Sequence, residues 1–313
     1  MPDFIKINGQ KIGVGQIDEI YLNIARLPTY TNIDLPVHIY RGHEDGPVLL
    51  LTGGLHGDEI NGIEIIRRMI SQNLITPEKG SVIAIPLVNI YGFIQNVRGV
   101  PDGKDINRSF PGVKGGSLAR LLAYTLMHQI VPQIDVGLDF HTGGASRANY
   151  PQIRGALDIP ENVDLAKAFA SPLVVHSRLI NKSFRKAAQK IGKHILVYET
   201  GEALRYDEFG IQEGINGTLR VMKHLGMRDD APEPNEYEIL MKSNWIRARY
   251  AGLFQTRIKL GDHIKKNQLV GYITDPYGNE RFKAKASYSG YVIGLNNSPV
   301  VHKGDALMHI GHN

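Results

Sequence analysis

A histidine and a glutamate, three positions apart, follow a short apolar run near the start of the sequence. The run at residues 48–51 predicts a buried strand, and the segment TGGLHGDEINGIEII at residues 52–66 carries His56 and Glu59 just after it. On a helical turn this spacing puts both side chains on one face, where an imidazole and a carboxylate could bind one ion. Such nitrogen and oxygen ligands suit Zn²⁺. The alternative is that His56 caps a helix start and Glu59 interacts with the helix dipole.

A third ligand is predicted at the end of a later strand. Residues 136–140 form an apolar run that leads into His141, and Asp139 lies two positions earlier, so both side chains point to the same side of a strand. The Asp139 carboxylate could orient the imidazole, although a histidine at a sheet end can also be purely structural. Two imidazoles and one carboxylate would leave a fourth position for water, the arrangement of catalytic rather than structural zinc.

A carboxylate at the end of a third apolar run is the predicted general acid/base. Apolar runs alternate with helical periodicity, which indicates a mostly parallel sheet covered on both faces. Sites in such folds lie beyond the carboxyl ends of the strands, so we expect His56, His141 and Glu199 to meet at one rim. Glu199 would move the proton between water and the leaving group, with Glu202 as the second choice. The alternative is that Glu199 caps the next segment.

A long segment rich in Gly, Pro, Asn and Asp, residues 89–116, carries further polar candidates. A connection of this length is usually functional or disordered. Arg98 and Arg108 could pair with a carboxylate or stabilise an oxyanion, and Asn107 could assist. For any one of them, ordinary surface charge is the alternative, and the same holds for Arg154 and Arg185.

Composition restricts the class of protein. The chain has 313 residues, 42% hydrophobic and 21% charged, as expected for a soluble globular protein of one large or two ordinary domains. The net charge of +5 comes from scattered Lys and Arg, which argues against a nucleic-acid partner and is compatible with an anionic small substrate. Cysteine is absent, which excludes disulfides and thiolate metal sites. The start, MPDFIKINGQ, has no signal pattern, and no apolar run reaches the roughly 20 residues of a membrane helix, so we expect a cytoplasmic protein without a membrane partner.

The elements that would position these residues follow from periodicity. Antiparallel edge strands are predicted first, at residues 4–7, 20–27 and 37–42. Further strands are predicted at 48–52, 82–88, 136–140, 173–177 and 195–199. Helices are predicted at 59–70, 117–130, 161–170, 183–191 and 211–225. The segment NYPQIR, residues 149–154, is interpreted as a loop.

The end of the chain has a different character. Residues 228–236 are polar and proline-bearing, and predict a linker. Short β-like pieces separated by glycines follow, which predicts a small all-β module over residues 237–313. We therefore expect a catalytic domain at 1–230, with its N-terminal strands in 1–45, and a separate C-terminal module. Open strand edges in the module could pair between subunits, so a homo-oligomer is plausible.

Four motifs in order, GGLHGDEINGIE, DINRSFPG, LDFHTGG and YETGE, resemble the succinylglutamate desuccinylase/aspartoacylase family. That family is related to the zinc carboxypeptidases. The resemblance covers roughly residues 45–230, and the tail is similar to the lipoyl/biotinyl-like barrel-sandwich module that the family often carries. It implies an α/β fold of the zinc-carboxypeptidase type, with a mostly parallel or mixed sheet flanked by helices, and a C-terminal all-β module.

The resemblance also implies roles for the candidate residues. His56, Glu59 and His141 would bind one zinc ion per subunit. Glu199 would be the general acid/base, and Arg98 would polarise the scissile carbonyl.

Three further residues would bind the substrate. Asn107 and Arg108 would hold its carboxylate, and Arg185 lies where relatives place another substrate arginine. The implied activity is hydrolysis of the amide bond of an N-acyl amino acid or a similar small carboxylate. One alternative is a zinc carboxypeptidase, which needs an open groove for a peptide where a deacylase needs a closed pocket. Another is a non-catalytic protein that keeps the fold and the metal.

Overall fold

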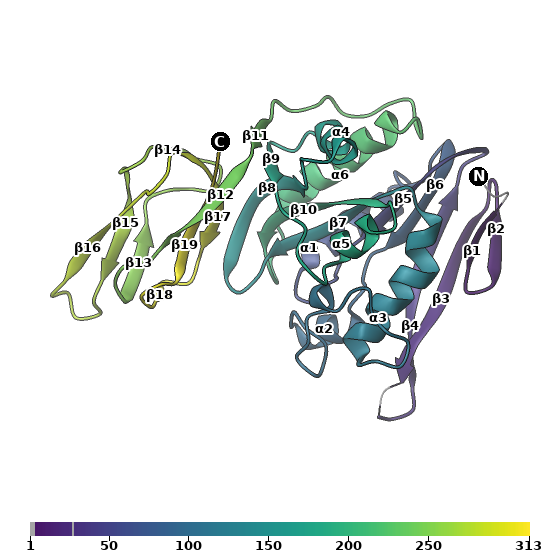
Figure 1. Ribbon diagram of the computed structural model, residues 1–313, viewed down its shortest axis with the longest axis horizontal. Helices are drawn as coiled ribbons and strands as arrows, with labels where there is room; N and C mark the ends of the chain where they lie inside the picture. The colour runs from purple at the N-terminus through teal and green to yellow at the C-terminus, as the bar shows by residue number, and fades with distance from the viewer. Residues whose placement is uncertain (1–3, 27) are drawn as a thin grey trace.

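The computed structural model describes residues 4–26 and 28–313, and a single 13-stranded mixed sheet runs through most of it (Figure 1). The order along the sheet is β12-β19-β17-β8-β10-β7-β5-β6-β4-β3. The C-terminal strands form one end of the molecule and the N-terminal hairpin lies at the other (Figure 1). Within the described ranges, no helix combines the length and apolar character needed to cross a bilayer.

Four parallel strands form the middle of this sheet: β10 (His194–Glu202), β7 (Val136–Gly143), β5 (Glu44–Thr52) and β6 (Lys79–Ile85). Apolar residues in these strands alternate between two cores. Leu49 and Leu51 of β5 face one core, and Leu50 faces the other. Because both faces are buried, the strands read as nearly continuous apolar runs, as the sequence analysis expected.

Helices cover both faces. Residues of α1 (Ile60–Ser71), α4 (Pro160–Phe169) and α6 (Glu208–His224) join the core that contains Leu49. Residues of α3 (Leu118–Thr125) and α5 (Phe184–Gln189) join the core that contains Leu50. Shorter helical pieces are α2 (Ile90–Gln95), the 3₁₀ turns Ile106–Arg108 and Val131–Gln133, and a π-helical turn at Leu126–Ile130.

The N-terminal strands lie at an edge, as predicted. β3 (Ile17–Arg26) and β4 (Asn32–Arg41) extend the sheet in antiparallel fashion beyond β6. β1 (Phe4–Ile7) and β2 (Gln10–Gly13) form a separate hairpin. Residues 1–3 and 27, which belong to the predicted N-terminal region and to the predicted strand at 20–27, lie outside the described residues.

The prediction of a loop at 149–154 is wrong. These residues lie in β8 (Arg147–Gly155), which pairs antiparallel with β10 and parallel with β9 (Leu173–His176), itself paired with β11 (Glu238–Leu240). The strand has no apolar alternation because buried polar side chains take tertiary partners; Gln152, for example, donates to the Ile293 carbonyl at 2.7 Å. Pro151 sits where the β8–β10 register shifts, so no ladder hydrogen bond is lost to it.

The tail is an all-β module, as predicted, but it joins the main sheet through β8. β17 (Gly290–Asn296) pairs with β8, and it continues to β19 (Ala306–His312) and β12 (Lys242–Arg247), with β14 (His263–Ile264) alongside. A four-stranded sheet packs on it: β16 (Arg281–Lys285), β15 (Leu269–Thr274), β13 (Gly252–Thr256) and β18 (Val300–Val301). Their contact surface is a third apolar core made entirely of residues between 246 and 310.

Gly62 allows α1 to lie directly against β7. A Cβ built on Gly62 would lie 2.6 Å from the Phe140 Cβ and 2.8 Å from the Phe140 carbonyl oxygen. The absence of a side chain therefore sets the distance between the start of α1 and residue 141.

We expect Gly62→Ala to lower the free energy of unfolding by about 1–3 kcal/mol, the usual cost of overpacking, although alanine is the better helix former. Urea denaturation followed by circular dichroism would measure it. Gly115→Ala is the matched control, since no described atom lies within 4 Å of its Cβ position. Equal stability of the two variants would show that the α1–β7 approach is not tightly packed.

Candidate metal centre and active site

His56 and Glu59 are brought together by a turn that precedes α1. His56 lies in the loop after β5, and the Glu59 N–H donates to the His56 carbonyl at 3.2 Å, which closes a four-residue turn. Glu59 is the N-cap residue of α1, and its side chain makes no capping hydrogen bond with any described residue. The prediction of proximity therefore agrees with the structure, but a turn produces it rather than a turn of helix.

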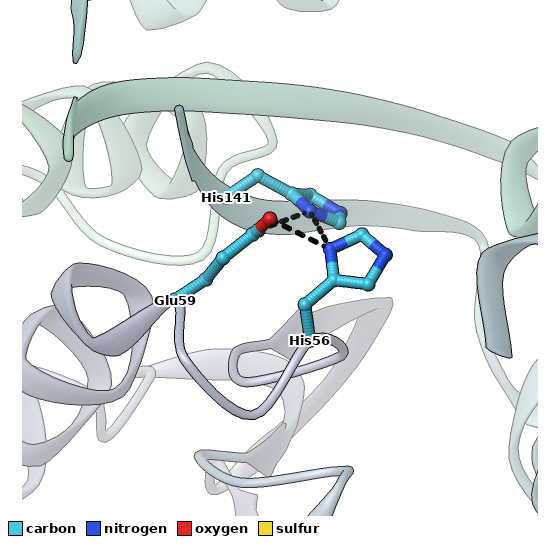
Figure 2. Close-up of side chains that lie close together, drawn as sticks. All are labelled: His56, Glu59 and His141. Atoms are coloured by element: carbon cyan, nitrogen blue, oxygen red, sulfur yellow. Dashed lines mark hydrogen bonds and ion pairs between the residues drawn. The ribbon is translucent and has the colours of Figure 1, made fainter. Parts of the chain in front are cut away.

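The three predicted ligands converge (Figure 2). The Nδ1 atom of His56 lies 2.8 Å from Glu59 Oε1, and the Nδ1 atom of His141 lies 2.7 Å from Glu59 Oε2. The two Nδ1 atoms are 3.2 Å apart. All three side chains are at most 5% exposed. The donor atoms thus form a compact, buried group of the kind that can hold a metal ion.

The other nitrogen of each imidazole contacts a carboxylate. His56 Nε2 lies 3.1 Å from Asp105 Oδ1, and His141 Nε2 lies 2.8 Å from Asp139 Oδ2. An ionised carboxylate only accepts, so each Nε2 carries the hydrogen and donates it. With a metal ion bound, each Nδ1 would offer its lone pair to the metal in place of a proton, the arrangement that orients histidine ligands in metal sites.

The two imidazole nitrogens have the spacing of ligands in a tetrahedral zinc site, whereas the carboxylate oxygens lie at hydrogen-bond distance from them. With Zn–N bonds of about 2.0–2.1 Å, two ligand nitrogens of a tetrahedral site are about 3.3 Å apart, close to the 3.2 Å observed between the Nδ1 atoms. Three electron-rich atoms this close repel one another unless a cation or a proton lies among them. Two imidazoles and one carboxylate also leave one position open.

Electrostatics at the site favour a cation. Burial disfavours charge on His141, but the carboxylates of Asp139 and Glu59 outweigh this cost and raise its pKa well above the ordinary value. Burial likewise opposes ionisation of Glu59, yet His56 and His141 hold the pKa of Glu59 well below its usual range. The carboxylate remains ionised although it is buried.

Arg98 contacts the metal site directly. Its Nη1 donates to Glu59 Oε1 at 2.9 Å, and its Nε and Nη2 donate to Asp105 Oδ2 at 3.2 and 3.1 Å. Partial burial opposes ionisation of Asp105, but His56 and Arg98 outweigh it and lower the pKa of Asp105. One guanidinium therefore bridges the candidate ligand Glu59 and the carboxylate that contacts the candidate ligand His56.

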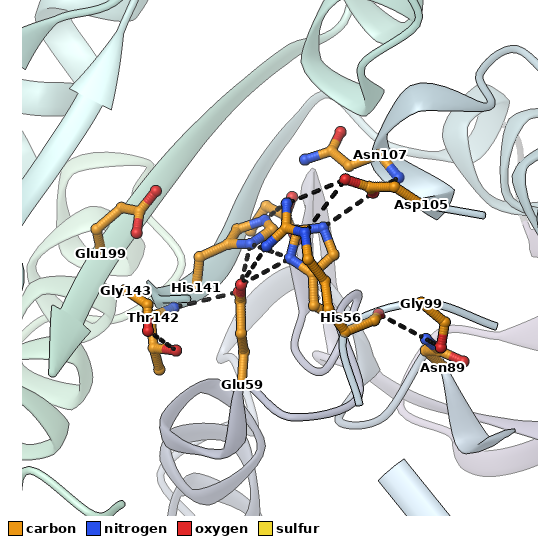
Figure 3. A network of polar contacts seen from close by, with 12 residues as sticks. His56, Glu59, Asn89, Gly99, Asp105, Asn107, His141, Thr142, Gly143 and Glu199 are labelled. Atoms are coloured by element: carbon orange, nitrogen blue, oxygen red, sulfur yellow. Dashed lines mark hydrogen bonds and ion pairs between the residues drawn. The ribbon is translucent and has the colours of Figure 1, made fainter. Parts of the chain in front are cut away.

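Glu199 lies on β10, opposite His141 in the parallel register with β7. Its Oε2 accepts from Asn149 Nδ2 at 2.7 Å, and its Oε1 lies 3.5 Å from Arg154 Nη1. Figure 3 shows Glu199 near His141 and Glu59, with no interaction drawn between its carboxylate and theirs. Its neighbours come from β8, the strand that the sequence did not indicate.

The side chains of His56, Glu59 and His141 line a cavity of about 290 Å³. Its lining includes the eight residues to which the family resemblance gave a role: His56, Glu59, Arg98, Asn107, Arg108, His141, Arg185 and Glu199. Glu202, the second choice for the general acid/base, is not among the lining residues. The structure brings the eight residues together, and their individual roles stay predictions. Arg154, left open by the sequence, also lines the cavity.

Sequence reasoning missed four contributors. Asp105 lies inside the motif DINRSF and could have been suspected from it, whereas Asn149 lies in the segment interpreted as a loop. Trp245 and His309 come from the C-terminal module and stack with ring centroids 4.4 Å apart. Burial, with a smaller effect of Arg154, lowers the pKa of His309 to about 3, so it is a neutral part of the wall.

Comparison with known proteins identifies the family. The model of the succinylglutamate desuccinylase/aspartoacylase catalytic domain matches residues 45–225. The chain belongs to this family. An N-alpha-acetyl-L-2,4-diaminobutyric acid deacetylase of Halomonas elongata is 30% identical over 261 residues, covering 77% of this chain and 74% of the relative.

Solved structures agree with the fold. A succinylglutamate desuccinylase/aspartoacylase from Rhodobacter sphaeroides superposes with a TM-score of 0.84 at 26% identity, over 95% of each chain. The product-bound ectoine utilization protein EutE from Ruegeria pomeroyi gives 0.85 at 23% identity, also over 95% of each chain, and supports the fold alone. The match to the family model ends at residue 225. Trp245 and His309, which line the cavity, therefore lie outside the matched segment.

We expect Asp139→Asn to weaken binding of added Zn²⁺ by about 10- to 100-fold, because the amide cannot hold the His141 imidazole as a carboxylate does. Competition with a chromogenic chelator would measure the affinity. Asp135→Asn is the control, since Asp135 caps the Val48 N–H just before β7 begins. If both variants bound zinc like the parent protein, the orienting role of Asp139 would be wrong.

Proposed function

We propose that this protein is a zinc-dependent hydrolase that cleaves the amide bond of an N-acyl amino acid or a similar small carboxylate. One observation supports this proposal most strongly: the clustered donor atoms of His56, Glu59 and His141 share one cavity with Glu199 and Arg98. Membership of a family of deacylases supports it, as does the relative named as a deacetylase.

In this proposal, a bound zinc ion would act as a Lewis acid toward the scissile carbonyl and lower the pKa of a water ligand. Glu199 would accept a proton from the attacking water and deliver it to the leaving nitrogen. Asn149 would keep one Glu199 oxygen in place through its 2.7 Å hydrogen bond, and leave the other for the proton. Arg98 would donate to the oxyanion that develops on the carbonyl oxygen.

Arg185 is proposed to bind the substrate carboxylate. Its side chain is 8% exposed, its Nη2 donates to Ser177 Oγ at 3.1 Å, and its Nη1 has no hydrogen-bond partner among the described residues. Burial, reinforced by Arg154, lowers the pKa of Arg185 to about 10. A buried guanidinium without a counter-ion is costly, and a carboxylate ligand would remove that cost.

Asn107 and Arg108 would complete the carboxylate site. The Asn107 Oδ1 accepts from the Phe184 N–H at 2.9 Å, so its NH₂ group is the end that a carboxylate would meet. Arg108 donates Nη1 to the Asn107 carbonyl at 2.7 Å and also lines the cavity.

The charge of the cavity favours substrates without a cationic side chain. Arginines at 98, 108, 147, 154 and 185 line it, and among the described residues Glu59 and Glu199 are its lining carboxylates. Both already have proposed roles, so neither is left to receive an ammonium group. We therefore propose neutral or acidic N-acyl amino acids as substrates, in contrast to the diaminobutyric acid derivative in the name of the Halomonas relative.

The C-terminal module supports a deacylase over a carboxypeptidase. Trp245 and His309 form part of the cavity wall, which limits the room for an extended peptide. We propose that residues 1–230 act as the catalytic domain and residues 237–313 as a module that completes its pocket.

We expect Glu199→Gln to lower kcat by about 100- to 10,000-fold, the usual contribution of a general acid/base, while zinc content is unchanged. Steady-state hydrolysis of N-acetyl amino acids and metal analysis would measure both. Glu202→Gln is the control, because Glu202 is three residues further on and bonds to Asn297. Unchanged hydrolysis in Glu199→Gln would rule out the proposed mechanism.

We expect Arg185→Gln to raise KM for N-acetylaspartate by about 10- to 100-fold, since a charge-assisted contact to a carboxylate is lost. Steady-state kinetics with N-acetylaspartate would measure the KM. The same assay with N-acetyl-2,4-diaminobutyrate and blocked dipeptides, each with and without a chelator, would test the substrate class and the metal dependence. Arg178→Gln, an exposed arginine not among the cavity residues, is the control. Preference for blocked dipeptides, or activity that survives chelation, would contradict the proposal.

A further inference from the structure

A second, larger cavity lies beside the catalytic one. Its volume is about 700 Å³, and its walls come from the segment 104–112, from α3 and the π-helical turn after it, and from α5 with its flanking loops. We call it the cationic groove after the six basic residues in its lining: Lys104, Arg108, Arg120, Lys182, Lys186 and Lys190.

The groove has no negative lining within the part of the chain that the structure describes. Lys104 pairs with Asp102 at 2.6 Å. No other basic residue of the groove forms an ion pair within the described ranges, although salt bridges are frequent elsewhere in the molecule, such as Arg68 with Glu208. Several like charges around one hollow repel one another and create a positive potential that attracts anions.

The floor of the groove is apolar. Phe110, Met127 and Ala187 are buried there, and the Phe110 ring stacks on Phe184 with centroids 4.8 Å apart. A ligand that fits this lining would have an apolar body as well as negative charge. Inorganic ions alone would leave the floor uncovered.

One wall separates the groove from the catalytic cavity. Arg108 and Ser183 line both spaces, while Arg185 lines the cavity and its neighbour Lys186 lines the groove. The two spaces therefore have different cations, apart from Arg108, and can hold two anions at once.

We propose that the cationic groove is a second binding site, distinct from the catalytic cavity, for an organic anion that carries two or more negative charges on a partly apolar body. Phosphate esters and polycarboxylates share this chemistry. The proposal depends on neither the metal nor hydrolysis, so it stands or fails independently of the proposed function.

Binding of pyrenetetrasulfonate, a fluorescent polyanion with an aromatic body and weak affinity for metals, tests the site. We expect a rise in fluorescence anisotropy with the zinc-loaded protein. The triple variant Arg120→Gln, Lys186→Gln, Lys190→Gln should weaken binding by at least about tenfold, since three charge-assisted contacts are removed. These side chains are exposed or half-buried, and circular dichroism would check that the fold is kept.

The matched control removes the same charge from exposed positions outside the groove: Lys223→Gln, Lys265→Gln, Lys303→Gln. It should bind the probe within twofold of the parent protein. Phenyl phosphate or tricarballylate should displace the probe, and the stronger competitor identifies the anion class. The proposal would be overturned if the probe did not bind, or if neither competitor displaced it. It would also be overturned if the two triple variants lost probe affinity equally, or if Arg185→Gln lost as much probe affinity as the groove variant.

Discussion

The contact between Glu59 and the two histidine Nδ1 atoms is the interaction on which the site depends. Two carboxylates, half-buried Asp105 and fully buried Asp139, contact the far nitrogen of each imidazole, and the close packing of α1 on β7 brings the candidate ligands together. Asp139 is itself held by the Thr52 hydroxyl at 2.8 Å, so neighbouring strands β5 and β7 determine the position of one ligand. The parallel sheet thus acts as a rigid frame for a group of atoms that would otherwise repel one another.

The C-terminal module is part of the same frame. β17 pairs with β8, and Asn149 of β8 holds Glu199, so the module and the proposed general acid/base are two strands apart in one sheet. Gly294 of β17 lies so close that a Cβ there would be 2.9 Å from Asn149 Oδ1. Trp245 and His309 of the same module form part of the cavity wall. The module is therefore structurally continuous with the candidate site.

The sequence was informative wherever the pattern was local. Buried parallel strands and the residues that follow them could be predicted, because apolar runs and strand ends are visible in one dimension, and this was sufficient to bring His56, His141 and Glu199 to one rim. The turn that closes on Glu59 could not be distinguished from a helical turn, since both give a spacing of three. β8 was missed because its buried residues, such as Asn149, are polar and take partners from distant segments. Trp245 and His309 were missed because only the tertiary packing of the C-terminal module brings them to the cavity.

The most direct test of this account is a crystal structure of the zinc-loaded protein with anomalous data collected at the zinc edge. It should show one anomalous peak in each chain, with Nδ1 of His56, Nδ1 of His141 and a Glu59 oxygen at about 2.0–2.2 Å from it. A peak elsewhere, ligation through the Nε2 atoms, or no peak at full zinc occupancy of the solution would contradict it.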